Sequence, residues 1–463
     1  MKKPEKLYEG NMRKKYLLFA IPLILSALLS QSYNFVNSIM IGKFIGSEAF
    51  AATAVTAELI ELLNSIFFGY LTGIGIYVSV LFGKNKYEKM LNIIKLNFLL
   101  SSMFAIIIAF VCNLFCHQIF DILNVNEQVY KNAEMYFRTY VLGYIIFQFN
   151  WGFTYISNGM SLTKLPLAAS VITGIINVCL NYLFLSVLLK GIGYSALSTV
   201  ISSFVTTIVY FFIYIRLFKN LGIKLRGLKI NKELFKDSMG YGAPSMFQQM
   251  TMYACTTLVA PLTNTCATAA ISGYAVANKA RSLIMAIYQN SGKANTTFVA
   301  QAMGAGKIDK IKKGISIGTT QGLIFFVVTL SLFVIFAKQF TALFLDPVAD
   351  AESFTVSVNI IRFSFPFIVF NVFNNLFHGI FRAVGSGMLM FISTLIYAIS
   401  YVIYAYILFS VLPYEIRIYG VHLALSGAHI TELIFATYLF VTGKWKSQEY
   451  LLLEHAGQNK QES

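Results

Sequence analysis

The sequence predicts an all-α integral membrane protein with twelve transmembrane helices in two parallel six-helix repeats. Hydrophobic residues make up 57% of its 463 residues and charged residues only 12%, whereas charged residues are about 25% of an ordinary soluble domain. The mean hydropathy is +0.67. Landmarks also recur: Pro22 and Pro244 open matching apolar stretches 222 residues apart, and Gly159 matches Gly379 at an offset of 220. A duplicated chain of this composition belongs in a bilayer.

Twelve apolar runs are long enough to cross a membrane, because a helix needs about 20 apolar residues to span the hydrocarbon core. The first half contains six, at residues 16–42, 50–82, 91–116, 134–157, 165–189 and 193–218. The second half contains six more, at residues 235–261, 269–302, 315–337, 356–384, 387–411 and 420–443. The sequence lacks the alternating pattern of a membrane barrel, and irregular backbone cannot face lipid with its polar groups unpaired. The spans are therefore expected to be helical.

These spans predict two lobes with a basic connection between them. We expect an N-terminal six-helix lobe at residues 1–219, a cytoplasmic connector at 220–232, a C-terminal six-helix lobe at 233–445 and a cytoplasmic tail at 446–463. Each lobe has an even number of spans, so both lobes begin on the same side of the membrane. The repeats are therefore parallel, related by an axis along the membrane normal.

The net charge of +16 is explained by membrane topology. In the twelve-span arrangement, 26 of the 36 Lys and Arg lie on one side, in the amino terminus, the connector, the tail and the turns after even-numbered spans. Cytoplasmic segments are enriched in Lys and Arg, which places both termini in the cytoplasm of a bacterial cell, at its cytoplasmic (inner) membrane. The basic residues form no patterned binding surface, which argues against nucleic acid as a partner. We expect a monomer.

Several strings of residues resemble the multidrug and toxic compound extrusion (MATE) family of transporters. One string runs from Pro22 to Gly46 and ends in Met40-Ile41-Gly42-Lys43-Phe44-Ile45-Gly46. Another combines Thr297-Phe298-Val299-Ala300-Gln301 with Gly304-Ala305-Gly306-Lys307, and a third is Gly379-Ile380-Phe381-Arg382-Ala383-Val384-Gly385. The resemblance covers nearly the whole chain. It implies an exporter whose two lobes alternate access to a central cleft and expel organic cations and other amphipathic compounds in exchange for Na⁺ or H⁺.

The resemblance also implies a polar cation-coupling cluster in the N-terminal lobe. That family carries an Asp on the first span, an Asn and an Asp on the fifth and a Thr on the sixth; the matching positions here are Asn37, Asn177, Asn181 and Thr199. Both carboxylates are replaced by amides, as is a third family carboxylate at Asn371. An amide binds no proton and brings no negative charge. We therefore expect no proton coupling at this cluster, and only weak Na⁺ coordination by its oxygens.

Three carboxylates remain within the predicted spans, and they are candidates for cation coupling because an ionisable group in a membrane helix costs about 2.5–3.5 kcal/mol or more. Glu58 and Glu61 lie three residues apart on one helix face, either as a proton-binding pair or as hydrated residues at the outer interface. Glu432 lies deeper, with His429 one turn earlier. These two form either a titrating pair or a buried polar brace, and two ligands alone do not complete a metal site.

Several other polar residues are candidates for the lining of a substrate cavity. Lys293 is the most unusual, because the family pattern is uncharged there: it either faces the cavity, where it pairs with an acid or binds an anion, or snorkels to an interface. Lys279 and Arg281 are interpreted as interfacial anchors. The full set of cavity candidates is Gln31, Tyr33, Gln248, Gln289, Lys293, Asn371, Asn375 and His378.

Two functions remain open, and a third is excluded. The first is antiport-driven efflux of small molecules through alternating access, with Glu432 or the Glu58 and Glu61 pair carrying the coupling. The second is a flippase for a lipid-linked oligosaccharide or a related amphiphile, favoured by the missing carboxylates. No nucleotide-binding loop or nucleophile motif is present, and the five cysteines have no metal-ligand spacing. We expect no enzyme activity, no metal and no cofactor beyond the coupling ion, Na⁺ or H⁺.

Overall fold

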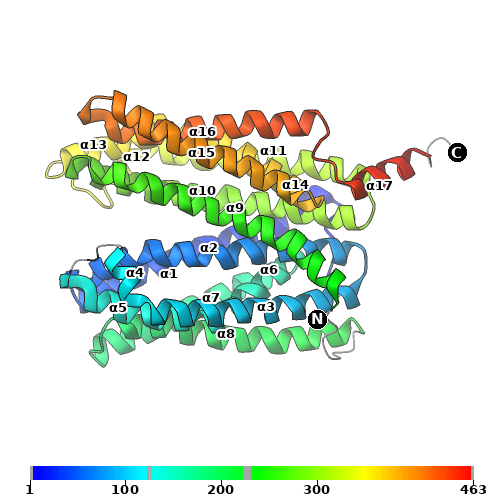
Figure 1. Ribbon diagram of the computed structural model, residues 1–463, viewed down its shortest axis with the longest axis horizontal. Helices are drawn as coiled ribbons and strands as arrows, with labels where there is room; N and C mark the ends of the chain where they lie inside the picture. Colours follow the sequence, from blue (N-terminus) through cyan, green and yellow to red (C-terminus); the bar gives the residue numbers. More distant parts are fainter. Residues whose placement is uncertain (1–3, 123–124, 126, 223–230, 460–463) are drawn as a thin grey trace. The chain divides into compact units, whose positions relative to one another are not determined.

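The computed structural model describes residues 4–122, 125, 127–222 and 231–459, which fold into helices without any strand among them (Figure 1). Residues 223–230 of the predicted connector lie outside the described residues. The all-helical fold predicted from composition is thus confirmed.

The helices repeat in length as well as in order. The first three helices have 33, 37 and 28 residues, as do the first three of the second half. They are α1 (Met12–Phe44), α2 (Ser47–Gly83) and α3 (Tyr87–Leu114), followed in the second half by α9 (Lys232–Asn264), α10 (Thr268–Gly304) and α11 (Ile308–Ile335). The second set begins 220, 221 and 221 residues after the first. The structural repeat therefore has the same period as the sequence repeat.

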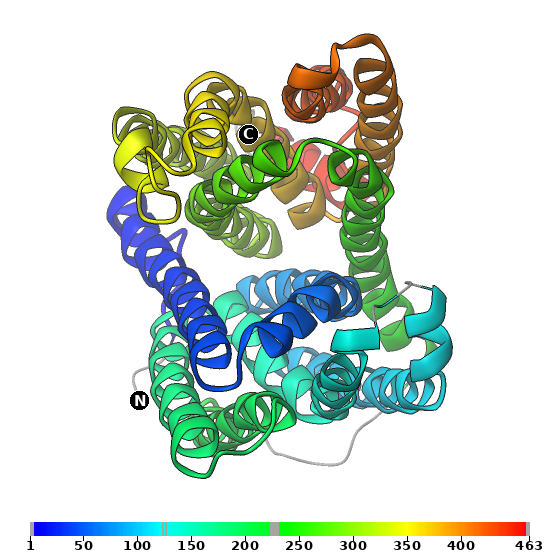
Figure 2. The same ribbon diagram turned by 90° about the vertical axis from the view of Figure 1, so that its left-hand side faces the viewer.

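Contacts divide the chain into two compact units, whose helices are seen end-on in Figure 2. Unit 1 comprises the chain up to Lys6 and Leu25–Met246, and unit 2 comprises Leu7–Ile24 and the chain from Phe247 onward. Besides α2 and α3, unit 1 contains α4 (Cys116–Ile122), α5 (Glu127–Leu142), α6 (Tyr144–Gly159), α7 (Lys164–Asn181), a π-helical turn η1 (Tyr182–Val187) and α8 (Gly193–Asn220).

Unit 2 repeats the sequence of five α-helices after α10 and α11, as α12 to α16, but its π-helical and 3₁₀ turns lie at other places and it ends in an additional helix. Its further elements are α12 (Ala337–Thr341), α13 (Ala351–Asn359), the π-helical turn η2 (Ile360–Ser364), the 3₁₀ turn η3 (Phe365–Phe367), α14 (Ile368–Ala383), α15 (Gly387–Val411), the 3₁₀ turn η4 (Tyr414–Ile416), α16 (Arg417–Val441) and α17 (Gln448–Asn459). The predicted tail thus contains a helix, α17, whose Tyr450 is buried. Its Glu454 accepts a hydrogen bond from Lys446 at 2.7 Å.

Helices α1 and α9 each contribute to both units. Each changes unit two residues after a proline, at Pro22 in α1 and Pro244 in α9. Proline inside a helix removes one backbone hydrogen bond and weakens the helix at that point. The compact units therefore differ from the predicted lobes in the first halves of these two helices, at equivalent places in the repeat.

Equivalent tyrosine–serine pairs attach these first halves to their units. In unit 2, the Tyr16 hydroxyl on α1 lies 2.7 Å from the Ser291 carbonyl oxygen and 3.0 Å from its Oγ on α10. In unit 1, the Tyr70 hydroxyl on α2 lies 3.0 Å from the Ser238 Oγ on α9. Position 238 is the repeat of position 16 and position 291 the repeat of position 70. The two units therefore share the same tyrosine–serine contact, but the tyrosine of one unit occupies the repeat position of the serine of the other.

Nine helical segments of the described chain are long and apolar enough to cross a membrane. The predicted spans outside this set are α9, α10 and the segment that the structure divides into α5 and α6. Helix α10 tolerates polar residues because they are buried inside unit 2; they include Asn290, Ser291, Asn295 and Thr296. The span predicted at 134–157 is interrupted at Gly143, where a Cβ would meet Val200 and Phe147 side chains.

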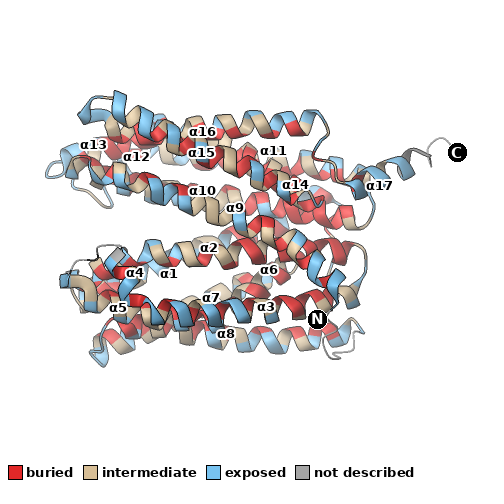
Figure 3. Ribbon diagram, viewed as in Figure 1, coloured by how far each residue is buried: buried red, intermediate tan, exposed pale blue. Residues whose placement is uncertain are grey.

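The remaining spans differ in how much of their surface faces outward. In α2, 83% of the most apolar window is buried, compared with 17% in the segment formed by α7 and η1. Figure 3 shows exposed residues along the outer sides of α8 and α16, which carry large apolar side chains such as Phe212 and Ile434. Large exposed apolar side chains on these helices fit a lipid environment.

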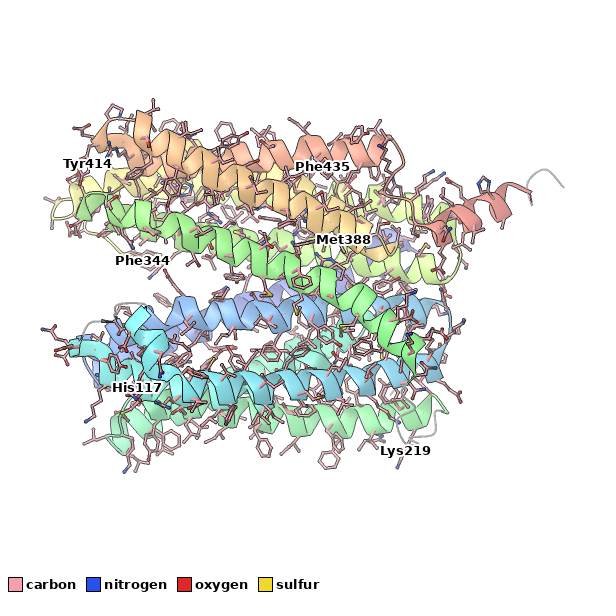
Figure 4. The ribbon with its side chains drawn as sticks, in the orientation of Figure 1. His117, Lys219, Phe344, Met388, Tyr414 and Phe435 are labelled. Carbon is pink, nitrogen blue, oxygen red and sulfur yellow. The ribbon has the colours of Figure 1, made fainter. Side chains whose placement is uncertain are left out.

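Labelled side chains mark the ends of each unit. His117 and Lys219 lie at opposite ends of unit 1, and Tyr414 and Met388 lie toward opposite ends of unit 2 (Figure 4). Phe435, three residues after Glu432, lies well inside the length of α16. Glu432 is the sixteenth of the 25 residues of α16 and therefore lies inside its span.

Close packing of α2 on α9 generates the first prediction. Gly69 and Gly73 are four residues apart on α2, a spacing that brings helix backbones together in membranes. A Cβ at Gly73 would strike the Tyr241 carbonyl of α9, and one at Gly69 would strike the backbone of Ser245 and Met246. We expect Gly73→Leu to lower stability by about 2 kcal/mol or more, because overpacking forces the backbones apart. The thermal midpoint of the purified protein in detergent measures this loss.

Gly240 on α9 is the matched control. It has nothing within 4 Å of an added Cβ, so Gly240→Ala is expected to be neutral or to stabilise the helix by up to about 1 kcal/mol. Equal thermal midpoints for Gly73→Leu and the unmodified protein would contradict the packing argument.

Candidate functional site

The four amide-cluster residues, Asn37, Asn177, Asn181 and Thr199, lie together inside unit 1. Asn181 donates from Nδ2 to Asn37 Oδ1 at 3.0 Å and to Asn177 Oδ1 at 3.3 Å. Asn177 donates from Nδ2 to Thr199 Oγ1 at 3.1 Å. A single chain of hydrogen bonds thus joins α1, α7 and α8. The resemblance placed these residues at one site, and the structure brings them into direct contact.

Local backbone geometry positions Asn177 and Asn181 toward this cluster. They are one turn apart on α7, so they share a helix face, and both are fully buried. The π-helical turn η1 begins directly after Asn181, and such turns occur frequently at functional sites. Among the described residues, the Asn181 Oδ1 atom has no hydrogen-bond partner. The cluster therefore offers one buried neutral oxygen and no charge.

The carboxylate cluster of unit 2 consists of Glu432, His378 and His429 with Asn371 and Asn374. Asn374 donates from Nδ2 to Glu432 Oε2 at 2.8 Å and to the His429 carbonyl oxygen at 2.9 Å. His378 Nε2 lies 3.2 Å from Glu432 Oε1, and His429 Nδ1 lies 3.4 Å from Oε2. The side chains of His378, His429 and Glu432 are 8%, 6% and 4% exposed. A nearly dry carboxylate is therefore held between two imidazoles.

Two further contacts orient His429. Its Nε2 atom lies 3.0 Å from Asn371 Nδ2, and its ring stacks on Tyr397 with centroids 4.5 Å apart. The His378 contact is close but misaligned for a hydrogen bond, so it gains strength only when the imidazole carries a proton. In the described part of the chain, no group of three or more His, Cys, Asp or Glu has the geometry of a metal site.

A narrow pocket inside unit 2 adjoins the carboxylate cluster. Asn371 and His429 line one side of it, and the remaining wall includes Arg281 and Tyr288 from α10, Phe365 from the broken segment before α14, and His422 from α16. Pro366 and the turns η2 and η3 interrupt the helix here. The pocket and the carboxylate cluster therefore share two residues.

The other carboxylate candidates are placed differently. Glu58 and Glu61 are both exposed on α2. In unit 2, Glu432 has His378, His429 and Asn374 as its partners. The sequence analysis had considered Lys293 as a partner for an acidic residue. Lys293 is exposed on α10.

The remaining cavity candidates are dispersed. Gln31 is exposed on α1, and Tyr33 is half-buried beside Gly174. Gln248 is buried and its Oε1 lies 3.4 Å from Arg382 Nη2. Gln289 is half-buried on α10. Asn375 of α14 packs against Gly292 of α10. Of this set, Asn371 and His378 join the carboxylate cluster, and Asn371 alone among them lines the described pocket.

Sequence reasoning did not place the basic residues Arg281 and His422 in a pocket. Arg281 was interpreted as an interfacial anchor at the outer end of its span, yet it is the fourteenth residue of the 37-residue helix α10 and lines the pocket. His422 was not singled out. It precedes His429 by seven residues, or two helical turns, so both lie on one face of α16. That spacing was a usable signal for their proximity.

Known proteins resemble this chain along most of its length. The MatE family model matches residues 22–183 and 244–407. The probable multidrug resistance protein YoeA of Bacillus subtilis is 25% identical, covering 74% of this chain and 75% of its own. The probable multidrug resistance protein YpnP of the same organism is 23% identical, covering 95% and 97%. A solved multidrug resistance MATE family transporter, described in an outward-facing conformation, has a TM-score of 0.88 at 19% identity, covering 97% and 100%.

The amide cluster generates the second prediction. Asn37→Asp places a carboxylate where Asn37 now accepts from Asn181, and a charged contact adds about 1.5 kcal/mol or more, roughly tenfold in affinity. We expect transport by the variant to acquire or strengthen a dependence on Na⁺ or H⁺. Flux into proteoliposomes under separate Na⁺ and pH gradients measures this.

The neighbouring Asn34→Asp is the control for added charge. Asn34 lies one turn earlier on α1 and is exposed. If both variants give the same ion response as the unmodified protein, position 37 has no part in cation binding.

Proposed function

Because this chain belongs to the MatE family of membrane transporters, we propose that it exports amphipathic small molecules in exchange for protons. The named relatives are multidrug resistance proteins, which favours efflux over the flippase alternative. Their bacterial source and the basic cytoplasmic segments support a location in a bacterial cytoplasmic membrane. We assign proton coupling to the carboxylate cluster of unit 2, with alternating access as the transport cycle.

The observation that carries this proposal is the buried Glu432 carboxylate between His378 and His429. A lone carboxylate at this depth is costly, and a proton shared with an imidazole offsets that cost. With one proton the cluster holds a carboxylate and an imidazolium, which neutralise each other. A second proton on the other imidazole or on the carboxylate changes the net charge by one. The cluster therefore has the composition of a reversible proton site.

Asn371 allows His429 to change its protonation state without losing a partner. When the His429 Nε2 atom is unprotonated, it accepts a hydrogen bond from the amide Nδ2, which lies 3.0 Å away. When Nε2 carries a proton, the same amide turned by half a rotation accepts through Oδ1. A carboxylate at this position would instead favour the charged imidazole alone. The amide that replaces the family carboxylate thus suits an exchangeable proton on the histidine.

The two residues that belong to both the carboxylate cluster and the pocket can couple proton binding to substrate binding. Asn371 and His429 line the pocket in unit 2 as well as contacting the cluster. Protonation that reorients the amide therefore changes the wall of the pocket. A coupled transporter needs such a difference, because an ion shifts a conformational equilibrium only by its differential affinity for the two states.

The other candidates support coupling less well. Glu58 and Glu61 are exposed on α2, whereas Glu432 is buried among imidazole and amide groups. The amide cluster in unit 1 is neutral and cannot exchange a proton. It remains a candidate for weak Na⁺ binding through the buried Asn181 Oδ1.

The third prediction tests Glu432 directly. Glu432→Gln keeps the shape of the side chain and the contact with Asn374 but removes the exchangeable carboxyl proton. We expect this variant to lose the pH dependence of substrate release from proteoliposomes, because a glutamine amide neither binds nor releases a proton. The flux of a cationic, a neutral and an anionic amphiphile, each under an imposed pH gradient, provides the measurement.

Glu58→Gln is the matched control, since it removes an exposed carboxylate from α2. It is expected to retain the pH response of the unmodified protein. Transport and pH dependence that survive unchanged in Glu432→Gln would remove Glu432 from the mechanism, provided that its thermal midpoint shows it to be folded.

A further inference from the structure

The pocket of unit 2 contains a cation that the proton site does not use. Arg281 lines the pocket from α10, and its Nε atom donates to the Met285 sulfur at 3.4 Å. Within the described ranges no carboxylate forms an ion pair with Arg281. An arginine inside a membrane helix is costly unless it finds a partner. Arg281 is half-buried and lines the pocket, so a group that enters the pocket can become its partner.

A second observation indicates the same kind of ligand. His422 is 3% exposed and lines the pocket beside Arg281. In the part of the chain that the structure describes, its Nε2 atom has no hydrogen-bond partner. Tyr274 holds the ring edge-on, with centroids 5.1 Å apart. A neutral imidazole can donate one hydrogen bond from Nε2, so a ligand atom that accepts from Arg281 can also accept from His422.

The nearby carboxylate does not neutralise Arg281. Glu432 forms no ion pair with Arg281, since its Oε1 lies 3.2 Å from His378 Nε2 and its Oε2 accepts a hydrogen bond from Asn374. Among the charged and titratable groups around the pocket, Arg281 is therefore the cation left for a ligand, while His429 faces both sites. Guanidinium groups bind carboxylates and phosphates through two parallel hydrogen bonds.

The rest of the wall is apolar and aromatic. Tyr288, Phe365, Phe367 and Leu425 line the same pocket. The pocket volume is about 10 Å³, about the space that one water molecule needs, so only the anionic head of a ligand enters between Arg281 and His422, and its apolar body lies against the aromatic side chains at the open side of the pocket. We propose that this pocket is a binding subsite for organic anions, with Arg281 as the charge partner and His422 as a second donor. This inference rests on the proposed export function, because it names the class of compound carried.

The test compares three probes that share one aromatic body. Isothermal titration of the purified full-length protein in detergent at neutral pH measures binding of 1-naphthoate, 1-naphthalenemethanol and 1-naphthylmethylammonium. We expect naphthoate to bind about tenfold or more tighter than the alcohol, as charge-assisted hydrogen bonds allow, and the ammonium compound to bind weakest. Naphthoate that binds no tighter than the alcohol, or that does not bind, overturns the inference.

Two variants locate the effect. Arg281→Gln is expected to remove most of the preference for naphthoate, and His422→Phe to reduce it while keeping an aromatic ring. The control is Lys279→Gln, because Lys279 is an exposed cation two residues away on α10 whose Nζ lies 4.8 Å from the Phe344 ring centroid. Equal losses in Arg281→Gln and Lys279→Gln, with both variants folded by thermal midpoint, contradict a specific role for Arg281.

The outcome is separable from the export proposal. Binding in detergent needs no ion gradient, so Arg281-dependent binding without gradient-driven flux refutes export alone. Proton-driven flux without an Arg281-dependent preference for the anion refutes the subsite alone.

Discussion

Inside a bilayer, every buried polar group must find its partners within the protein, and this constraint governs the interior of both units. Water is absent from the hydrocarbon core, so an unpaired amide or carboxylate there is expensive. In unit 1, the amides meet this requirement through hydrogen bonds to one another and to Thr199, which connect α1, α7 and α8. In unit 2, the Glu432 carboxylate contacts two imidazoles and accepts a hydrogen bond from an amide. The amide cluster of unit 1 and the carboxylate cluster of unit 2 therefore satisfy most of their polar atoms internally.

Duplication preserved the scaffold while the chemistry of the two halves diverged. Helix lengths, the prolines in α1 and α9 and the paired Tyr16–Ser291 and Tyr70–Ser238 contacts repeat. The polar clusters do not repeat between the two units. In unit 1 the cluster lies among α1, α7 and α8 and is neutral, whereas in unit 2 it lies between α14 and α16 and is ionisable. Packing positions must be kept for either half to fold, but a polar cluster needs to be charged in only one half for a single proton to be exchanged.

Breaks in helical regularity coincide with these clusters. The turn η1 follows Asn181, and η2, η3 and Pro366 precede Asn371. A π-helical turn or a proline alters the backbone hydrogen-bond pattern of one turn and re-aims the side chains beside it. In unit 2 the break also brings Phe365 to the pocket that Arg281 and His422 line. The irregular segments therefore shape the sites as well as connecting regular helices.

Composition and periodicity by themselves determined the membrane class, the helical fold, the duplication and the locations of most spans, because each depends on local hydrophobicity along the chain. The family resemblance predicted Asn37, Asn177, Asn181 and Thr199 as one cluster, and the scarcity of acidic residues within the predicted spans singled out Glu432, with His429 one turn away. Tertiary structure alone decided that Glu432 meets His378 from α14, that Arg281 lines a pocket with His422, and that α1 and α9 change unit after Pro22 and Pro244. These features join residues far apart in the chain, and helical periodicity gives the face of one helix without specifying which other helix it meets.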